Sequence, residues 1–302
     1  MDGVLIIDKA TGLTSHDVVN GVRRILHERS VGHLGTLDPM ATGVLPLVVG
    51  RMTRLAQFYT ASEKSYEGAI HFGFATETYD AEGEPAGPTQ KVKVSLEGLR
   101  ELSGRFKGRI RQTPPPFSAK KIQGVPAYKL ARKHREVDLK PVEVEIKEFE
   151  LTDWDGERAA FRARVASGTY MRSVAHEMGQ SLGCGAHLAS LRRTAVAEFG
   201  LADAHTLEAL EEAARQGRTE ELFIHARKLL PELPSVTANE ENLARIRVGR
   251  AVNLPELSRA SQVKVFQGQS ELIAIATRVA GSLFHAKIVL AAGTNAPPNG
   301  NQ

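Results

Sequence analysis

Residues 32–47 read GHLGTLDPMATGVLPL, a stretch that shows no helical or strand periodicity until its last residues. Its three glycines and its Asp-Pro pair predict a loop over residues 32–43. Residues 44–49 form an apolar run typical of a buried strand, and Pro46, which lacks an amide hydrogen, predicts an irregular ladder there. Asp38 is therefore expected in a loop just before a core strand.

The segments on either side of this loop predict a sheet with peripheral helices. Residues 4–7 suit a buried strand, and residues 16–28 have apolar positions at helical spacing after a possible cap at Thr14 or Ser15. Alternating apolar residues predict further strands, and the turn residues 153–156 join two of them as a hairpin. These strands cover residues 66–74, 142–151 and 158–166.

The C-terminal part has a different pattern. Residues 200–240 are rich in acids and predict helices that end near Pro231 and Pro234. Short strands at 263–266, 271–278 and 283–290, separated by glycines, then predict a small β-barrel. We expect an α+β fold with a mixed, largely antiparallel central sheet, divided into a domain 1–232, a β-barrel domain 233–291 and a disordered tail 292–302.

Composition restricts the class of protein. Of 302 residues 42% are hydrophobic and 25% are charged, which is ordinary for a soluble globular chain. The N-terminus has an acid where a signal peptide needs basic residues, and Cys184 is the only cysteine, so neither a disulfide within the chain nor a CxxC zinc site can form. A cytoplasmic protein without a membrane segment is expected.

Basic charge is concentrated in one segment. Residues 100–140 hold 12 Lys or Arg against 3 Asp or Glu, whereas the whole chain has 39 against 35. Such a stretch is typical of a partner that carries phosphates, although a solvated surface would give the same count. The segment contains the run 113–117, TPPPF, which cannot be helix or central strand and predicts a projecting loop.

Familiar cofactor sites are missing from the sequence. There is no GxxxxGK[ST] phosphate loop and no GxGxxG after a strand. Residues 176–180, HEMGQ, begin like a zinc-protease helix but end in Gln instead of the second His ligand. No metal and no cofactor are expected.

The loop around Asp38 resembles the catalytic loop of the TruB family of tRNA pseudouridine synthases, whose pattern is close to GHxGxLDPxATGxLxx. Leu34 departs from it where a small hydroxyl residue is common. Further resemblances follow in order along residues 3 to about 195, and Ala10 departs from them at a usual proline. They are GVLIIDK at 3–9, KSY at 64–66, QTPPPFSA at 112–119, AYKLAR at 127–132, GTYMRS at 168–173 and GAHLASLRR at 185–193. A weaker resemblance to a PUA-like RNA-binding module covers residues 243–249 and the strands beyond.

The resemblance implies a pseudouridine synthase fold and the isomerisation of uridine, expected at position 55 in the T-arm of tRNA, without a cofactor. It implies that Asp38 is the nucleophile, that Arg172 pairs with it, and that Tyr66 stacks on the target base or accepts a proton. Arg172 is expected near the start of a helix capped by Ser167 or Thr169. Residues that resemble the family's substrate contacts are His33, Tyr66, Tyr170, Leu191 and Lys9.

Each of these residues has a plainer interpretation. Asp-Pro is an ordinary turn pair, arginines commonly lie on the surface, and a strand tyrosine commonly packs in a core. Leu191 alone would also be a core residue. The resemblance, which covers most of the chain, favours the functional interpretation.

The partner is expected to be tRNA, bound by a monomer that needs no protein partner. Side chains of the basic segment expected to meet the RNA backbone are Lys120, Lys121, Lys129, Arg132, Lys133 and Arg135. Two alternatives remain at this stage: an RNA-binding or RNA-folding module without catalysis, and a subunit of a guide-RNA particle such as the related dyskerin proteins.

Overall fold

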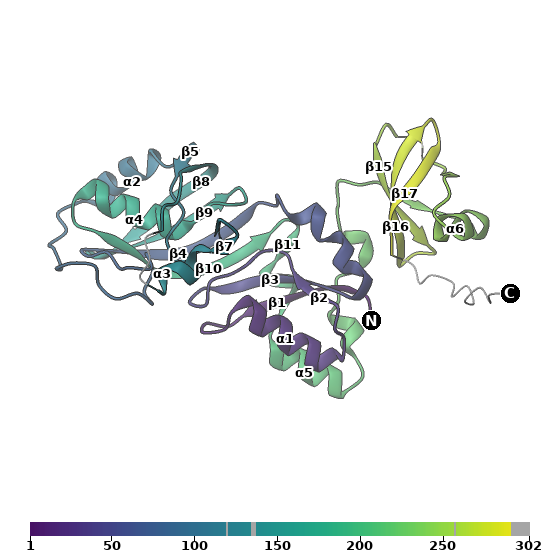
Figure 1. Ribbon diagram of the computed structural model, residues 1–302, viewed down its shortest axis with the longest axis horizontal. Helices are drawn as coiled ribbons and strands as arrows, with labels where there is room; N and C mark the ends of the chain where they lie inside the picture. Colours follow the sequence, from purple (N-terminus) through teal and green to yellow (C-terminus); the bar gives the residue numbers. More distant parts are fainter. Residues whose placement is uncertain (119, 134–136, 257, 291–302) are drawn as a thin grey trace.

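The computed structural model describes residues 1–118, 120–133, 137–256 and 258–290. These residues form a long central sheet with helices against it, a small projecting ribbon and a separate C-terminal sheet (Figure 1). The predicted α+β class with a largely antiparallel sheet is confirmed. No helix in the described ranges combines the length and the apolar character that crossing a membrane requires.

The central sheet of the described chain has ten strands, with β12-β1-β3-β10-β4-β9-β8-β5 as its main path. Strand β2 pairs with β3, and β11 pairs with β10. The bounds are β1 (Gly3–Lys9), β2 (Val31–His33), β3 (Thr42–Val49), β4 (Lys64–Phe72), β5 (Gly108–Gln112), β8 (Val142–Trp154), β9 (Arg158–Val165), β10 (Ala186–Val196), β11 (Phe199–Gly200) and β12 (Ala204–His205).

The two halves of this sheet meet at a short parallel contact. Strand β3 pairs with β10 only through Thr42 opposite Arg192 and Gly43 opposite Arg193. The loop that carries Asp38 enters β3 immediately before this contact. The topology therefore places Asp38 where the two halves of the sheet join.

Helices pack on the sheet through apolar faces. Helix α1 (Ser15–Leu26) begins at a capping box in which Thr14 and Asp17 satisfy each other's backbone amides, so Thr14 is the cap. Its buried valines share one apolar cluster with β1, β3, β4 and the helix α4. The other helices are α2 (Leu96–Gly104), α4 (Met171–Leu182) and α5 (Leu207–Arg215), with 3₁₀ turns η1 (Gly50–Tyr59), η2 (Leu201–Asp203), η3 (Thr219–Leu222) and η4 (Ala226–Lys228).

Two predictions about residues 32–49 were wrong. The predicted loop 32–43 is partly strand. Residues 31–33 form β2, which pairs with the end of β3, and β3 itself already starts at Thr42. The ladder between β1 and β3 runs through Pro46 without a register shift. Pro46 contributes only its carbonyl, which accepts the amide of Leu34 at 2.9 Å, so its missing donor costs nothing here.

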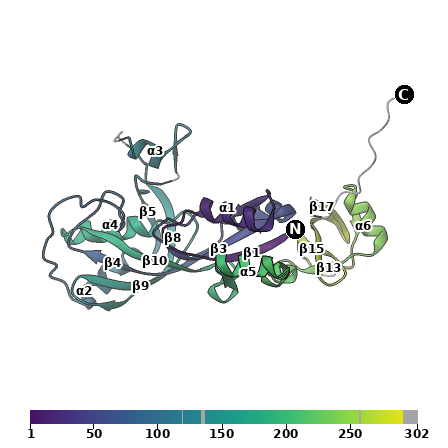
Figure 2. The same cartoon turned by 90° about the horizontal axis from the view of Figure 1, so that it is seen from below.

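The basic segment also differs from the prediction. Residues 113–118 do not project: Pro114, Pro115 and Ser118 are buried. The part that projects is the hairpin of β6 (Lys121–Ile122) and β7 (Val125–Pro126) with helix α3 (Ala127–Ala131), which stands away from the sheet in Figure 2. The proline run is buried because its carbonyls are used at the site described below.

The C-terminal module is a five-stranded sheet of order β13-β15-β16-β17-β14 with one helix. The described strands form an open path, in keeping with a curled, PUA-like half-barrel. Their bounds are β13 (Ser235–Thr237), β14 (Val252–Asn253), β15 (Gln262–Gln267), β16 (Glu271–Ala280) and β17 (Leu283–Val289), and helix α6 spans Glu240–Arg247. The boundary at residue 232 stays a prediction, and the predicted tail 292–302 lies outside the described residues.

The module is joined to the central sheet by a shared apolar cluster. Val4 and Met52 on one side pack in the same cluster as Phe266, Ile275 and Leu290 on the other. Lys264, almost fully buried, donates its ammonium to the carbonyls of Arg227 and Leu229 at 3.0 and 2.6 Å. The shared apolar cluster and these buried hydrogen bonds fix the module on the sheet.

Candidate active site

The loop that carries Asp38 is held by hydrogen bonds to Gly12 and Ser15, at the start of α1, and by a turn of its own. The Ser15 hydroxyl donates to the Leu37 carbonyl at 3.1 Å and accepts the Leu37 amide at 2.8 Å. The Pro39 carbonyl accepts the Gly12 amide at 2.9 Å, and the Ala41 amide closes a turn on the Asp38 carbonyl. The start of α1 therefore fixes the backbone on which the carboxylate stands.

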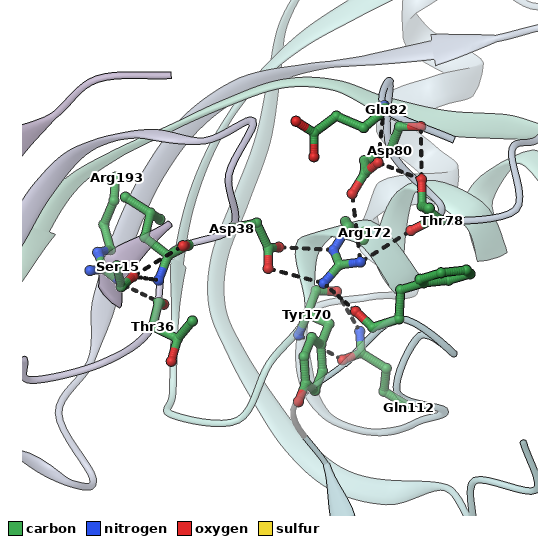
Figure 3. Close-up of polar contacts among 12 residues, drawn as sticks. Ser15, Thr36, Asp38, Thr78, Asp80, Glu82, Gln112, Tyr170, Arg172 and Arg193 are labelled. Atoms are coloured by element: carbon green, nitrogen blue, oxygen red, sulfur yellow. Dashed lines mark hydrogen bonds and ion pairs between the residues drawn. The ribbon is translucent and has the colours of Figure 1, made fainter. Parts of the chain in front are cut away.

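Asp38 faces the guanidinium of Arg172 in a two-point contact (Figure 3). Nη2 of Arg172 donates to Oδ1 at 3.1 Å, and Nε lies 2.9 Å from Oδ2, although its N–H does not point straight at that oxygen. The side chain of Arg172 is 5% exposed and that of Asp38 is 33% exposed. The arginine is thus buried, whereas the carboxylate opens toward solvent and toward any substrate.

A second carboxylate, Asp80, lies on the other side of Arg172 (Figure 3). Its Oδ2 is 3.6 Å from Nη1, and its side chain is 5% exposed. The Thr78 hydroxyl and the Glu82 amide donate to Oδ1, so the acid is held in a polar turn. Asp80 was not predicted from the sequence. The polar run TETYD at 76–80, just after a strand, was the available signal.

Backbone carbonyls complete the surroundings of Arg172. Nη1 donates to the Thr78 carbonyl at 3.2 Å and Nη2 to the Phe117 carbonyl at 3.1 Å. The proline run therefore packs on the site because its last carbonyl binds this guanidinium. A guanidinium whose two terminal nitrogens are both hydrogen-bonded keeps one orientation, which is what fixing the Asp38 carboxylate requires.

Helix α4 carries Arg172 but begins without the predicted cap. The Ser167 hydroxyl donates to the Thr60 carbonyl, and the Thr169 hydroxyl is buried without a partner. Gln112 instead binds Tyr170, the residue before the helix: its Nε2 donates to the Tyr170 carbonyl, and its Oε1 accepts the Tyr170 amide at 2.8 Å. The prediction of a Ser167 or Thr169 cap was wrong because those hydroxyls have other surroundings.

Tyr66 and Leu191 lie on the neighbouring strands β4 and β10. Each is 8% exposed, and Leu191 stands opposite Gly68, two residues from Tyr66. Burial raises the pKa of the Tyr66 phenol, and the nearby charge of Arg193 opposes that shift. The phenol is therefore neutral near pH 7, as suits a stacking surface.

His33, on β2, and Tyr170, just before α4, are both half-buried. The Nδ1 of His33 accepts the Gly35 amide at 3.3 Å, and burial, followed by the charges of Arg193 and His16, lowers the pKa of its ring. Burial also raises the pKa of Tyr170. A neutral imidazole and a neutral phenol are consistent with contacts to an uncharged base.

Lys9 has no exposed surface, so it does not reach a substrate in this structure. Its ammonium donates to the carbonyls of Ala10, Leu13 and Pro39 at 2.9, 2.6 and 3.1 Å. Burial lowers its pKa to about 8, against the attraction of Asp38 and Glu82. Its position beneath Pro39 assigns it to the support of the loop.

The residues expected to meet RNA backbone are all exposed on or beside the projecting hairpin. They are Lys120, Lys121, Lys129, Arg132 and Lys133. Arg135 lies outside the described residues. These exposed cations are therefore grouped on the β6–β7 hairpin and the helix α3 that follows it.

A hollow of about 730 Å³ adjoins the site, with Met40, Glu82 and Leu191 in its lining. Asp38, Tyr66 and Arg172 do not line it, so it neighbours the paired carboxylate and guanidinium without containing them. Burial, followed by Asp80 and Asp38, raises the pKa of Glu82. Among the described residues no cluster of three or more His, Cys, Asp or Glu is arranged to hold a metal ion.

The fold and this site define a pseudouridine synthase. The chain superposes on a chain of a crystal structure described as a Cbf5-Nop10-Gar1 complex, with a TM-score of 0.71, 26% identity and coverage of 96% of this chain and 85% of that one. A chain from an H/ACA RNP bound to a substrate RNA gives the same TM-score at 23% identity, covering 97% and 86%.

The chain belongs to the TruB family of pseudouridylate synthases. The model of that family's N-terminal domain matches residues 23–171, and the model of the tRNA pseudouridylate synthase B C-terminal domain matches residues 172–234. The tRNA pseudouridine synthase B of Solibacter usitatus is 50% identical over 96% of this chain and 100% of its own length. That of Aquifex aeolicus is 38% identical, over 94% and 98%.

Proposed function

We propose that the protein isomerises one uridine of tRNA to pseudouridine, with Asp38 as the nucleophile. The observation that carries the proposal is the two-point contact of a one-third exposed Asp38 with a buried Arg172. The identity of 38% to 50% with curated relatives named tRNA pseudouridine synthase B supports tRNA as the substrate. The family's expected target is uridine 55 of the T-arm.

The reaction needs only groups that this chain supplies. The N1–C1′ bond breaks with its electron pair passing to uracil N1, while the Asp38 carboxylate attacks C1′ or acts through the 2′ position. The freed base turns and C5 bonds to C1′, which breaks the C1′–O bond to Asp38 or, by the 2′ route, returns the abstracted proton to C2′. One proton is transferred overall from C5 to N1. Nothing is oxidised or reduced, so the balance needs no cofactor.

Arg172 and Asp80 serve this step by orientation. Arg172 holds both oxygens of Asp38, and Asp80 with the carbonyls of Thr78 and Phe117 holds Arg172. A carboxylate placed within a fraction of an ångström of its productive position gains most of the advantage of an intramolecular reaction. The network thus accounts for a nucleophile that is partly exposed and still fixed.

The target nucleotide must leave its helix to reach Asp38, at a cost of about a few kcal/mol. Tyr66 and Leu191 offer apolar surfaces for the flipped base, and the half-buried His33 and Tyr170 are further candidates for contacts to it. The exposed cations of the α3 hairpin would bind phosphates of the T-arm. No protein partner is required by this arrangement, and we propose that a monomer acts.

The decisive experiment incubates the protein with an unmodified tRNA transcript and maps pseudouridine at single-nucleotide resolution. Wild type should modify uridine 55, and Asp38→Asn should bind the transcript without product. Product formed by Asp38→Asn would remove Asp38 from the mechanism. Binding without product by wild type would favour an RNA-binding module that has no catalytic activity. Product only in the presence of a guide RNA would favour a guide-RNA particle subunit.

A further inference from the structure

Arg193 on β10 is a second buried arginine of the site that the proposed mechanism does not use. It has no exposed surface and is among the largest fully buried side chains. Among the described residues no carboxylate lies within ion-pair distance of it, unlike Arg172. A buried cation that lacks a counter-ion is costly, so its contacts should explain why it is there.

The contacts of Arg193 hold the Asp38 loop on both sides. Before Asp38, Nη2 donates to the Gly35 carbonyl and Nη1 to the Thr36 carbonyl, each at 3.1 Å. After Asp38, Nε donates to the Val44 carbonyl at 2.8 Å. Figure 3 shows Arg193 and Arg172 on opposite sides of Asp38. One guanidinium therefore joins the segment before Asp38 to the segment after it.

Arg193 also connects the loop to Tyr66. The two residues are direct partners in the antiparallel pairing of β10 with β4, and the register shifts just after Arg193. The charge of Arg193 and its side-chain contact with the phenol lower the pKa of Tyr66 against the larger effect of burial. Lys64 is the first residue of β4, and its pKa is lowered to about 8 by burial and then by the charge of Arg193.

We propose that Arg193 is a positioning residue that sets the Asp38 loop against Tyr66, so that nucleophile and stacking surface keep one mutual geometry. It acts through the backbone carbonyls of Gly35, Thr36 and Val44 and does not touch the substrate. This inference rests on the proposed roles of Asp38 and Tyr66. Arg172 orients the carboxylate itself, whereas Arg193 places the backbone that carries it.

The test compares Arg193→Met and Arg193→Lys in single-turnover reactions at saturating tRNA. Arg193→Met should lower the saturating rate by about 100-fold, the scale of a 1 Å misplacement, with tRNA affinity nearly unchanged. Arg193→Lys should lose at least about tenfold but remain faster than Arg193→Met, because an ammonium keeps the charge and cannot reproduce the planar fork.

Lys264→Met is the matched control. Lys264 is likewise a buried cation that donates to backbone carbonyls, but it lies in the C-terminal sheet. Its loss should lower the melting temperature and leave the saturating rate as in wild type. A comparable rate loss in Lys264→Met would assign the Arg193 effect to general destabilisation and overturn the proposal.

A second measurement does not depend on activity. The Leu37 amide donates to the Ser15 hydroxyl and the Ala41 amide donates to the Asp38 carbonyl, so Arg193→Met should accelerate their hydrogen exchange while amides of β9 keep their protection. If wild type forms no pseudouridine, the proposed function fails, whereas this exchange result still reports on the loop.

Several outcomes would overturn the proposal. They are a wild-type saturating rate or unchanged loop exchange in Arg193→Met, a loss confined to tRNA affinity, and a lysine variant no better than the methionine variant. If Arg193→Met does not fold, Arg193→Lys decides: a saturating rate equal to that of wild type contradicts the positioning role, and a loss of tenfold or more with faster loop exchange supports it.

Discussion

Two regions of the molecule use the same set of charges, an arginine between two carboxylates, in opposite surroundings. At the candidate active site, Arg172 pairs with Asp38 and Asp80, and its side chain is 5% exposed. On the face of β9, Arg164 lies between Glu63 and Glu148 with its side chain 42% exposed. In both triads each carboxylate lies within ion-pair distance of the arginine, and the most direct difference between them is burial.

Burial changes what each triad does. Water and salt screen the surface triad, and its long side chains lose entropy when they are held together. The buried guanidinium has exchanged water for fixed carbonyls and carboxylates, so its position is determined and its loss leaves the charge of Asp80 without an ionic partner. The buried triad therefore gives orientation, whereas the surface triad adds little to either stability or function.

The largest expected effect is that of Arg172→Met. Removal of one partner from a buried pair costs roughly 3 to 5 kcal/mol because a buried charge is left uncompensated. We therefore expect a large fall in the urea midpoint and no measurable pseudouridine formation. Chemical denaturation and single-turnover assays provide the measurement, with Arg164→Met as the matched control. Equal destabilisation by the two variants would break the comparison.

Asp80→Asn should have the next largest effect. The amide keeps the size of the side chain but loses the charge that faces Nη1 of Arg172, so the guanidinium is held less firmly. We expect the saturating rate to fall by about 10- to 100-fold, by analogy with the loss of groups that orient a reacting residue. The affinity for tRNA should stay within threefold, roughly the scatter of such contacts. Glu148→Gln, on the surface triad, is the control.

The buried cation Lys9 sharpens the comparison through pH. Burial lowers its pKa to about 8, whereas an unfolded lysine titrates near about 10.4. Between these values the unfolded chain binds more protons, so the free energy of unfolding of wild type relative to Lys9→Met should rise from pH 8 to 10.5 and be lost as pH falls through 8. Urea midpoints across this range test it. The exposed Lys107→Met is the control, for which we expect no such change with pH. A difference in unfolding free energy between wild type and Lys9→Met that is equal at pH 8 and pH 10.5 would contradict the prediction.

The projecting hairpin offers a smaller test, because its charges are fully in water. Replacing Lys129 and Lys133 together by Gln should weaken tRNA binding and flatten the dependence of log Kd on log salt by about one unit per lysine. The saturating rate should be unchanged. Arg215→Gln on α5, which removes a cation already paired with Glu212, is the control. An unchanged salt slope would exclude phosphate contacts at these lysines.

Arg164→Met should have the smallest effect. Exposed ion pairs contribute little to stability, and this one is accessible to salt. We expect a shift in the urea midpoint close to the experimental error and wild-type activity. A fall in the urea midpoint as large as that of Arg172→Met would show that the β9 triad is a structural element in its own right.

Local signals predicted much of the fold correctly. Helix α1 follows from its valine spacing and from Thr14, and the β8–β9 hairpin follows from alternation around residues 153–156. These predictions succeed because periodicity and caps act over a few residues. The projection of the proline run and the cap of α4 were predicted wrongly, since Gln112 and Phe117 have partners far along the chain.

The sequence by itself determined that Asp38 stands in a loop before a core strand and that its motif belongs with those of pseudouridine synthases. Only the tertiary structure decided what surrounds that carboxylate: Asp80 across Arg172, the Phe117 carbonyl, and Arg193 beneath the loop. The physical reason is that these groups come from strands and loops tens of residues apart. Their contact exists only after the two halves of the sheet have met at β3 and β10.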